Sequence, residues 1–259
     1  MTIRLPHHGW LFDLDGTVYL GEALVPGAAE TIAALRAAGR RVAFLSNKPL
    51  STRADYADKL TRLGIPARAD EVITSSIVLA RHLQRLDAGA PVFVIGEPPL
   101  LGELRAHGFE VRGDARVRWV VIAFDRTFDY AKLNTALQAV RAGARLIATN
   151  PDRTCPTAEG EIPDCAGMIA AVEAVTGHTV EVIVGKPSPI ILDVALQTLG
   201  VAAGDCVIVG DRIETDIVMG QRLGLATVLV LTGITRAGDP RIAELRPDLV
   251  VPSIRSLVG

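Results

Sequence analysis

Cysteine and aromatic residues are scarce in this sequence. Aromatic side chains make up 4% of the 259 residues, and there are three cysteines, Cys155, Cys165 and Cys206. An odd number of cysteines without a CxxC pair predicts neither a disulfide framework nor a zinc site. The five histidines are scattered and form no HExxH pair, so they do not indicate a metal centre either.

Long apolar runs and basic clusters are also missing. No apolar stretch reaches the length of a membrane span. The formal net charge is -2 and no long basic run occurs, which argues against nucleic acid and anionic membranes as partners. The first predicted strand starts so early that a signal peptide has no room. We therefore expect a cytoplasmic protein with small soluble partners.

What the sequence does contain is a repeated alternation of apolar strands and amphipathic helices. The composition is 49% hydrophobic and 22% charged, which predicts a folded core. "GWLFDLD" is the first strand, a helix follows over 26–39 with Pro26 at its start and Gly39 at its end, and "RVAFLSN" is the second strand. This pattern predicts an α/β fold: a Rossmann-like parallel sheet with helices on both faces.

The alternation continues along the chain. Further helices are predicted over 52–63, 76–86, 130–142 and 167–177, and after Ile213. Ser188 is expected to cap a helix that has Pro189 in its first turn and ends at Leu199. The remaining predicted strands are "EVITS", "PVFVIG", "WVVIAF", "ARLIATN", "VEVIVG", "CVIVGD", "ATVLVLTG" and "DLVVPS".

Polar residues gather where four of these strands end. The segments are "DLDGT", "SN", "GD" and "GKPSP". Parallel sheets collect functional groups at the carboxyl ends of their strands, so the four segments should converge. Residues 79–180 contribute none of them. We therefore predict a core made of 1–78 and 181–259, with 79–180 forming a smaller inserted α/β domain that covers the site.

Two aspartates stand two positions apart at the first strand end. Carboxylates as close as Asp13 and Asp15 repel one another unless a cation lies between them or one holds a proton. Magnesium prefers oxygen ligands, and Asp211 at another strand end is the natural third protein oxygen. A carboxylate that attacks phosphorus forms an acyl phosphate, while its neighbour moves protons. The residues thus indicate phosphoryl chemistry.

Groups that hold a phosphoryl oxygen are present nearby. Gly16 and Thr17 would supply backbone N–H groups and a hydroxyl. Ser46 and Asn47 offer a second hydroxyl and an amide, and Lys186 offers an ammonium group.

The four segments match a known family. "DLDGT", "SN", "GKPSP" and "GDRIETD" resemble, in order and setting, the four signatures of the haloacid dehalogenase superfamily. The insert is similar to the cap of its NagD-like branch, subclass IIA, as are "GEPPLLGEL", "ATNPD" and the helix over 167–177. The resemblance implies Asp13 as the nucleophile and Asp15 as the general acid/base. It also implies that Ser46 and Lys186 bind the phosphoryl group.

The same resemblance implies a magnesium site. Asp13, the backbone carbonyl of Asp15 and Asp211 would bind the ion, and Asp216 would support it from outside the ligand set. Members that retain the second aspartate are phosphatases or phosphomutases, so Asp15 favours those activities. Caps of this branch often support dimers, so a homodimer is compatible with the sequence.

The inserted domain leaves the substrate open. Asn150 and Asp152 are expected on a loop that either forms a plain turn or makes a contact with the substrate or with the core. Cys155 occupies a position where relatives often carry a histidine or an aromatic residue, and "IPDCAG" stands where they read closer to "PGAG". Sugar phosphates, nucleotides, pyridoxal phosphate and glycerol phosphate are all compatible. Arg212 and Glu214 are expected to form a solvated ion pair.

We therefore expect a magnesium-dependent phosphatase that hydrolyses a small phosphate monoester through an aspartyl-phosphate. A phosphomutase would share that intermediate. A phosphate-sensing module phosphorylated on Asp13 is a third interpretation, although response-regulator receivers are about half this length and lack the insert. A calcium loop is disfavoured, because Val18 and Leu24 stand where an EF-hand needs glycine and glutamate.

Overall fold

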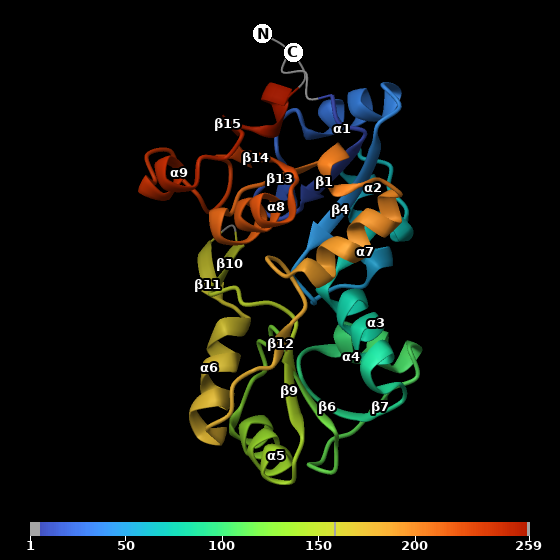
Figure 1. Ribbon diagram of the computed structural model, residues 1–259, viewed down its shortest axis with the longest axis vertical. Helices are drawn as coiled ribbons and strands as arrows, with labels where there is room; N and C mark the ends of the chain where they lie inside the picture. The colour runs from blue at the N-terminus through green and yellow to red at the C-terminus, as the bar shows by residue number, and fades with distance from the viewer. Residues whose placement is uncertain (1–5, 158, 258–259) are drawn as a thin grey trace.

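The structure, a computed structural model, describes residues 6–157 and 159–257 and contains two parallel sheets (Figure 1). The larger sheet has the order β15 (Leu249–Val251), β14 (Ala226–Val230), β13 (Cys206–Gly210), β1 (Gly9–Asp13), β4 (Arg41–Ser46) and β5 (Val72–Thr74). The smaller has the order β12 (Val182–Ile183), β9 (Arg145–Ala148), β8 (Trp119–Ile122), β6 (Pro91–Ile95) and β7 (Glu110–Val111). Two antiparallel hairpins pair β2 (Tyr19–Leu20) with β3 (Ala23–Leu24) and β10 (Thr154–Thr157) with β11 (Gly160–Pro163).

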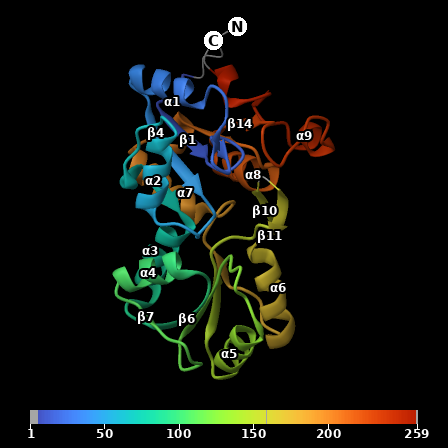
Figure 2. The same cartoon turned by 180° about the vertical axis from the view of Figure 1, so that it is seen from behind.

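Helices cover both faces of the six-stranded sheet, as predicted. Side chains alternate across a strand, so Trp10 and Phe12 of β1 pack with α1 (Ala28–Ala37) and α2 (Arg53–Arg62). Leu11 points the other way and packs with α3 (Ser75–Asp87), α7 (Pro189–Leu199) and α8 (Val218–Leu223). Figure 1 has α7 and α8 in front of the sheet, and Figure 2 has α1 and α2 in front. The central strands are therefore buried on both faces.

The five-stranded sheet is covered in the same way. Helices α5 (Tyr130–Arg141) and α6 (Cys165–Thr176) share an apolar cluster with one face. On the other face, α3 and α4 (Pro98–Ala106) belong to an apolar cluster that runs from Leu11 in the larger sheet to Val121 in the smaller one. Packing around α3 thus joins the two sheets without a break.

Local sequence signals determine where α7, the helix that follows "GKPSP", begins and ends. The hydroxyl of Ser188 accepts a hydrogen bond from the N–H of Ile190 at 3.3 Å, and Pro189 is the first residue of α7. The helix ends at Gly200, which has a left-handed conformation. The predicted start and end of this helix are confirmed.

One predicted core strand belongs to the other sheet. The strand before "GKPSP" was expected to continue the core, but β12 pairs with Ile147 and Ala148 of β9 in the five-stranded sheet. Only two residues pair, after which the chain crosses to the larger sheet. The predicted limits of the insert, 79 and 180, stay predictions, with α3 extending across the first and β12 following the second. The hairpins, α4, β7 and α9 (Pro240–Leu245) were not predicted.

Within residues 6–157 and 159–257, none of the helices has the length and apolar character needed to cross a membrane.

Candidate active site

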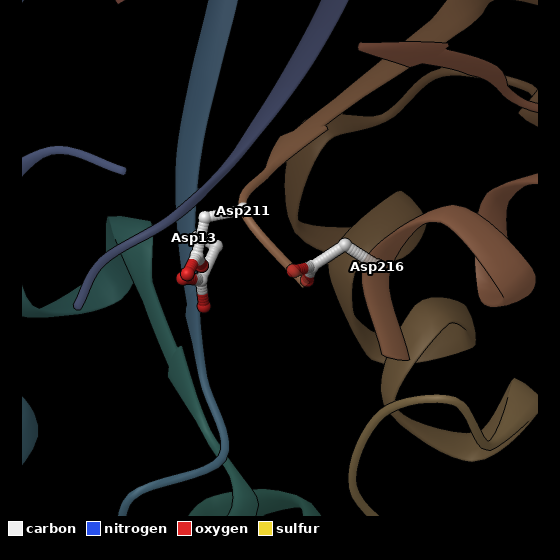
Figure 3. A group of neighbouring side chains, drawn as sticks. All are labelled: Asp13, Asp211 and Asp216. Atoms are coloured by element: carbon white, nitrogen blue, oxygen red, sulfur yellow. The ribbon is translucent and has the colours of Figure 1, made fainter. Parts of the chain in front are cut away.

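Three buried carboxylates meet at the carboxyl ends of the central strands. Asp13 ends β1, Asp211 follows the neighbouring strand β13, and Asp216 lies in a π-helical turn over Ile213–Ile217. Each offers an oxygen within 4.8 Å of the others, and Figure 3 shows the Asp216 carboxylate pointing toward the other two. Burial, with repulsion from Asp13, raises the pKa of Asp211 well above its ordinary value. Such a cluster favours a cation.

Lys186 supplies one positive charge to this cluster. Its side chain is 4% exposed, and its ammonium group donates to Asp13 and, at 2.6 Å, to Asp216. Burial alone would lower the pKa of Lys186, but the two carboxylates outweigh it and raise that pKa. Burial likewise raises the pKa of Asp216 to about 6, against the opposing effect of Lys186. When all are ionised, three carboxylates and one ammonium leave two negative charges, which fits a divalent cation with oxygen ligands.

Two glycines let the backbone approach these carboxylates closely. A Cβ atom on Gly233 would lie 1.8 Å from Asp211 Oδ2, and one on Gly210 would lie 2.2 Å from Asp216 Cγ. Asp211 Oδ2 also accepts a hydrogen bond from the N–H of Ile234 at 2.6 Å. Glycine is therefore needed at positions 210 and 233, because a side chain there would collide with Asp216 or Asp211.

The N–H groups of the Gly16–Thr17 turn already donate within the turn, and their binding of a phosphoryl group stays a prediction. The N–H of Gly16 donates to the carbonyl of Tyr19 at 2.8 Å, and the N–H of Thr17 donates to Leu14 at 3.3 Å. Gly16 has φ 89°, and a Cβ there would lie 2.6 Å from Asp211 Oδ2. The turn is committed to its own hydrogen bonds and to close packing. The Thr17 hydroxyl is buried and has no partner among the described residues.

Asp15 lies beside the cluster but is paired with a different cation. Its carboxylate is 3.5 Å from the ammonium of Lys48, which the sequence analysis did not single out. Burial opposes the charge of Lys48, but Asp15 and the Cys155 thiol together raise its pKa. The tyrosine hydroxyl of Tyr56 donates to the Lys48 carbonyl at 2.9 Å. The sequence did contain a signal for Lys48, because the polar residues at the end of the second predicted strand continue past "SN" to this lysine.

The two predicted residues after β4 have different surroundings. Ser46 is buried, its hydroxyl accepts from the N–H of Lys48 at 3.2 Å, and it lines the pocket described below. The Asn47 amide is already committed to protein partners. Its Nδ2 donates to Asp152 at 3.0 Å and to the Lys186 carbonyl at 3.1 Å, and its Oδ1 accepts from the Lys186 N–H at 2.8 Å. Asn47 thus holds the Lys186 backbone, and its binding of a phosphoryl group stays a prediction.

The part of the chain built around the five-stranded sheet covers the active-site residues described above. We call the five-stranded sheet, α4–α6 and the β10–β11 hairpin the cap. A pocket of about 50 Å³ lies between core and cap. Its walls are Asp13, Asp15, Ser46, Asn47, Lys48, Asp152, Thr154, Cys155, Pro156, Asp164, Lys186, Asp211, Arg212, Thr215 and Asp216.

The three cap residues predicted to contact a substrate are not equivalent. Asp152 and Cys155 line the pocket, but Asn150 is fully buried behind it. Asn150 Nδ2 donates to Asp152 and to Asp164, both at 3.1 Å, which makes it a support for two cap carboxylates. Burial raises the pKa of the Cys155 thiol to about 11.

Arg212 and Glu214 do not pair with one another, contrary to expectation. The Arg212 side chain is 11% exposed and donates to the Thr154 carbonyl at 2.8 Å, with Asp152 at 3.5 Å. Glu214 instead faces Arg241 at 3.1 Å. The buried guanidinium of Arg212 therefore contacts the cap rather than Glu214.

Fold and site together define a class of protein: a capped phosphohydrolase built on a Rossmann-like parallel sheet. Comparison with known proteins agrees. A haloacid dehalogenase-like hydrolase model matches residues 10–110, and a HAD-hydrolase-like model matches residues 183–257. The chain therefore belongs to the haloacid dehalogenase-like hydrolases, in their NagD-like branch, and is a phosphoric monoester hydrolase.

Similar proteins cover nearly the whole chain. The sugar-phosphatase AraL of Bacillus subtilis is 40% identical over 250 residues, which cover 96% of this chain and 91% of that protein. Human glycerol-3-phosphate phosphatase is 36% identical, covering 96% of this chain and 89% of its own length. Among solved structures, p-nitrophenyl phosphatase from Archaeoglobus fulgidus has a TM-score of 0.90 at 34% identity, with 97% of this chain and 98% of that chain covered. NagD from E. coli K-12 has a TM-score of 0.86 at 32% identity, with 98% of both chains covered.

Proposed function

We propose that this enzyme hydrolyses a small phosphate monoester with magnesium, through an aspartyl-phosphate on Asp13. The observation that carries the proposal is the buried group of Asp13, Asp211 and Asp216, with Lys186 bonded to two of its members. A carboxylate at the end of the central strand, flanked by an ammonium and a divalent-cation site, suits attack on an anionic phosphoryl group. Magnesium, when bound, would neutralise charge on the phosphoryl oxygens.

The residues then have separate roles. A carboxylate oxygen of Asp13 attacks phosphorus, and the bond from phosphorus to the ester oxygen breaks. Asp15 gives its proton to the departing alkoxide, then accepts a proton from the water that attacks the acyl phosphate. Inorganic phosphate leaves and the Asp13 carboxylate is regenerated. Lys186 and Ser46 would hold phosphoryl oxygens during both steps.

The metal would be held by oxygen ligands from two strand ends. Asp13, Asp211 and the backbone carbonyl of Asp15 are the proposed ligands. Asp216 would support the site by holding Lys186, to which it is bonded at 2.6 Å. Asp211 is itself fixed by the N–H of Ile234 and by the approach of Gly233.

We further propose a sugar or polyol phosphate as the substrate. The walls of the pocket are mostly charged or polar. Relatives are named a sugar-phosphatase, acid sugar phosphatases and a glycerol-3-phosphate phosphatase. A polyhydroxylated leaving group would suit polar walls better than an aromatic base would. A cytoplasmic location and a homodimer stay predictions from the sequence.

The proposal is tested by measuring phosphate release from a panel of monoesters with magnesium or with EDTA. The panel includes sugar phosphates, glycerol phosphate, nucleotides, pyridoxal phosphate and p-nitrophenyl phosphate. We expect magnesium-dependent release that is lost in Asp13→Asn and kept in Asp129→Asn, which changes an exposed carboxylate that caps α5. Release that survives in Asp13→Asn would overturn the proposal.

The same panel tests the two other interpretations. A phosphomutase would transfer the phosphoryl group to a second substrate hydroxyl with little free phosphate. A sensor would form a lasting acyl phosphate from a chemical phosphodonor while turning over no ester.

A further inference from the structure

Resting on this proposed function, we infer that Asp152 of the cap is a positioning residue that couples the seating of the cap to the placement of Lys186. The sequence left a plain turn, a substrate contact and a core-facing contact open at this position. The structure places the Asp152 carboxylate against two core residues, each next to a member of the site in sequence. Asn47 follows Ser46, and Arg212 follows Asp211.

The Asp152 carboxylate receives hydrogen bonds from both sides of the core–cap boundary. Its side chain is 11% exposed. Oδ2 accepts from Asn47 Nδ2 of the core at 3.0 Å and from Asn150 Nδ2 of the cap at 3.1 Å. Oδ1 faces the Arg212 guanidinium at 3.5 Å, and that group also donates to the Thr154 carbonyl at 2.8 Å. One cap carboxylate thus joins two strand ends of the core.

Asn47 connects this contact to the phosphoryl-binding lysine. Its amide forms two hydrogen bonds with the Lys186 backbone, accepting from the N–H at 2.8 Å and donating to the carbonyl at 3.1 Å. The side chain of Lys186 continues to Asp13. The same Asn47 Nδ2 therefore bonds both Asp152 and the Lys186 carbonyl, so a change at Asp152 alters the partner that fixes Lys186.

The chain around Lys186 leaves little room for adjustment. Gly185 donates its N–H to the Thr149 carbonyl of the cap at 2.7 Å. A Cβ on Gly185 would lie 2.4 Å from that carbonyl oxygen and 2.6 Å from Asn47 Oδ1. The segment that carries Lys186 is therefore packed between the end of a cap strand and Asn47. Movement of the cap away from the core would have to break this contact together with those of Asp152.

This arrangement has a consequence for catalysis. The Asp152–Arg212 pair is mostly buried, so removing one partner leaves an uncompensated charge. Lys186 must lie within hydrogen-bond distance of the transferred phosphoryl group, and a displacement of about 1 Å can cost about 100-fold in rate. Seating of the cap would then both exclude water and complete the phosphoryl site. An open cap would leave Lys186 displaced.

The inference is tested with Asp152→Ala, Asn47→Ala and the double variant. We expect each single variant to lower kcat by about 10- to 100-fold on p-nitrophenyl phosphate. The double variant should be no slower than the slower single one, because both residues act through one contact. Asp152→Asn keeps an acceptor for Asn47 and should recover part of the rate. The matched control is Asp114→Ala, which removes a half-exposed cap carboxylate paired with Arg112 and Arg116 and should leave kcat unchanged.

A second measurement works without turnover. Hydrogen exchange in peptides covering residues 184–188 should be faster in Asp152→Ala than in the wild type, and unchanged in Asp114→Ala. If the wild type hydrolyses no ester, the proposed function fails while the exchange result still decides the coupling. Unchanged exchange over 184–188, losses of kcat that multiply in the double variant, or a change in KM alone would each overturn the inference.

Discussion

Asp164 is predicted to make this protein less stable at neutral pH than in mild acid. The carboxyl group lies at the start of α6, is 4% exposed and accepts hydrogen bonds from the Cys165 N–H at 2.5 Å and from Asn150 at 3.1 Å. Burial, with repulsion from Asp152, raises its pKa from 3.8 to about 6 despite these bonds. The folded protein therefore holds this proton more tightly than the unfolded chain does.

The size of the effect follows from the two pKa values. A raised carboxyl pKa adds stability below about pH 3.8, and this is lost as the pH rises through about 6. A difference of about two pKa units corresponds to about 3 kcal/mol once the group is ionised. Asp164→Asn keeps an acceptor for both hydrogen bonds without the charge. It should raise the free energy of unfolding by about 3 kcal/mol at pH 7.5 and by about 1 kcal/mol at pH 4.5.

Urea unfolding of the wild type and Asp164→Asn at the two pH values measures this difference. Asp129→Asn is the control, because it also replaces a helix-capping aspartate, at the exposed start of α5. Equal gains at both pH values, or a loss of stability at pH 7.5, would show that the raised pKa of Asp164 does not lower the stability at neutral pH.

Three further predictions concern the site itself. Lys186→Met should abolish turnover. In EDTA it should also lower the free energy of unfolding, measured by urea titration, by about 3–5 kcal/mol, and adding magnesium should restore part of that stability. Gly233→Ala places a Cβ 1.8 Å from Asp211 Oδ2, so calorimetry should detect weakened magnesium binding. Gly102→Ala, whose new Cβ meets no atom within 4 Å beyond its chain neighbours and its own helix backbone, should bind magnesium normally. Cys155, whose thiol pKa is about 11 and which is buried, should react with iodoacetamide at pH 7.5 at least about 100-fold more slowly than free cysteine.

The parts of the fold predicted from sequence are those set by local signals. Apolar strands ending in polar residues placed Asp13 and Asp211 at adjacent strand ends, and the capping of α7 by Ser188 was correct in detail. The two-residue strand β12 was assigned to the wrong sheet because so short a pairing carries no periodicity of its own. Local periodicity identifies a strand, whereas its partner depends on contacts that are distant in sequence.

The site shows the same division. Residue type and order predicted that the carboxylates and Lys186 lie at one site. They did not predict which protein groups form hydrogen bonds with the other polar side chains of that site. Asn47 and Asp152 are 105 residues apart, and Arg212 and Thr154 are 58 apart, so no pattern in the sequence indicates either contact. The N–H groups of Gly16 and Thr17 were predicted to be available for a ligand, because the residue types do not reveal that both groups form hydrogen bonds within the turn.

The most direct test of the account is the reaction of Asp15→Asn with p-nitrophenyl phosphate. Nitrophenolate leaves without needing a proton, so the first step should survive, whereas hydrolysis of the acyl phosphate needs the base that is missing. We expect a burst of about one nitrophenolate per enzyme, followed by little turnover, with the phosphoryl group found on Asp13 by mass spectrometry of acid-quenched peptides. Steady turnover without a phosphorylated Asp13, or a phosphoryl group on another residue, would contradict it.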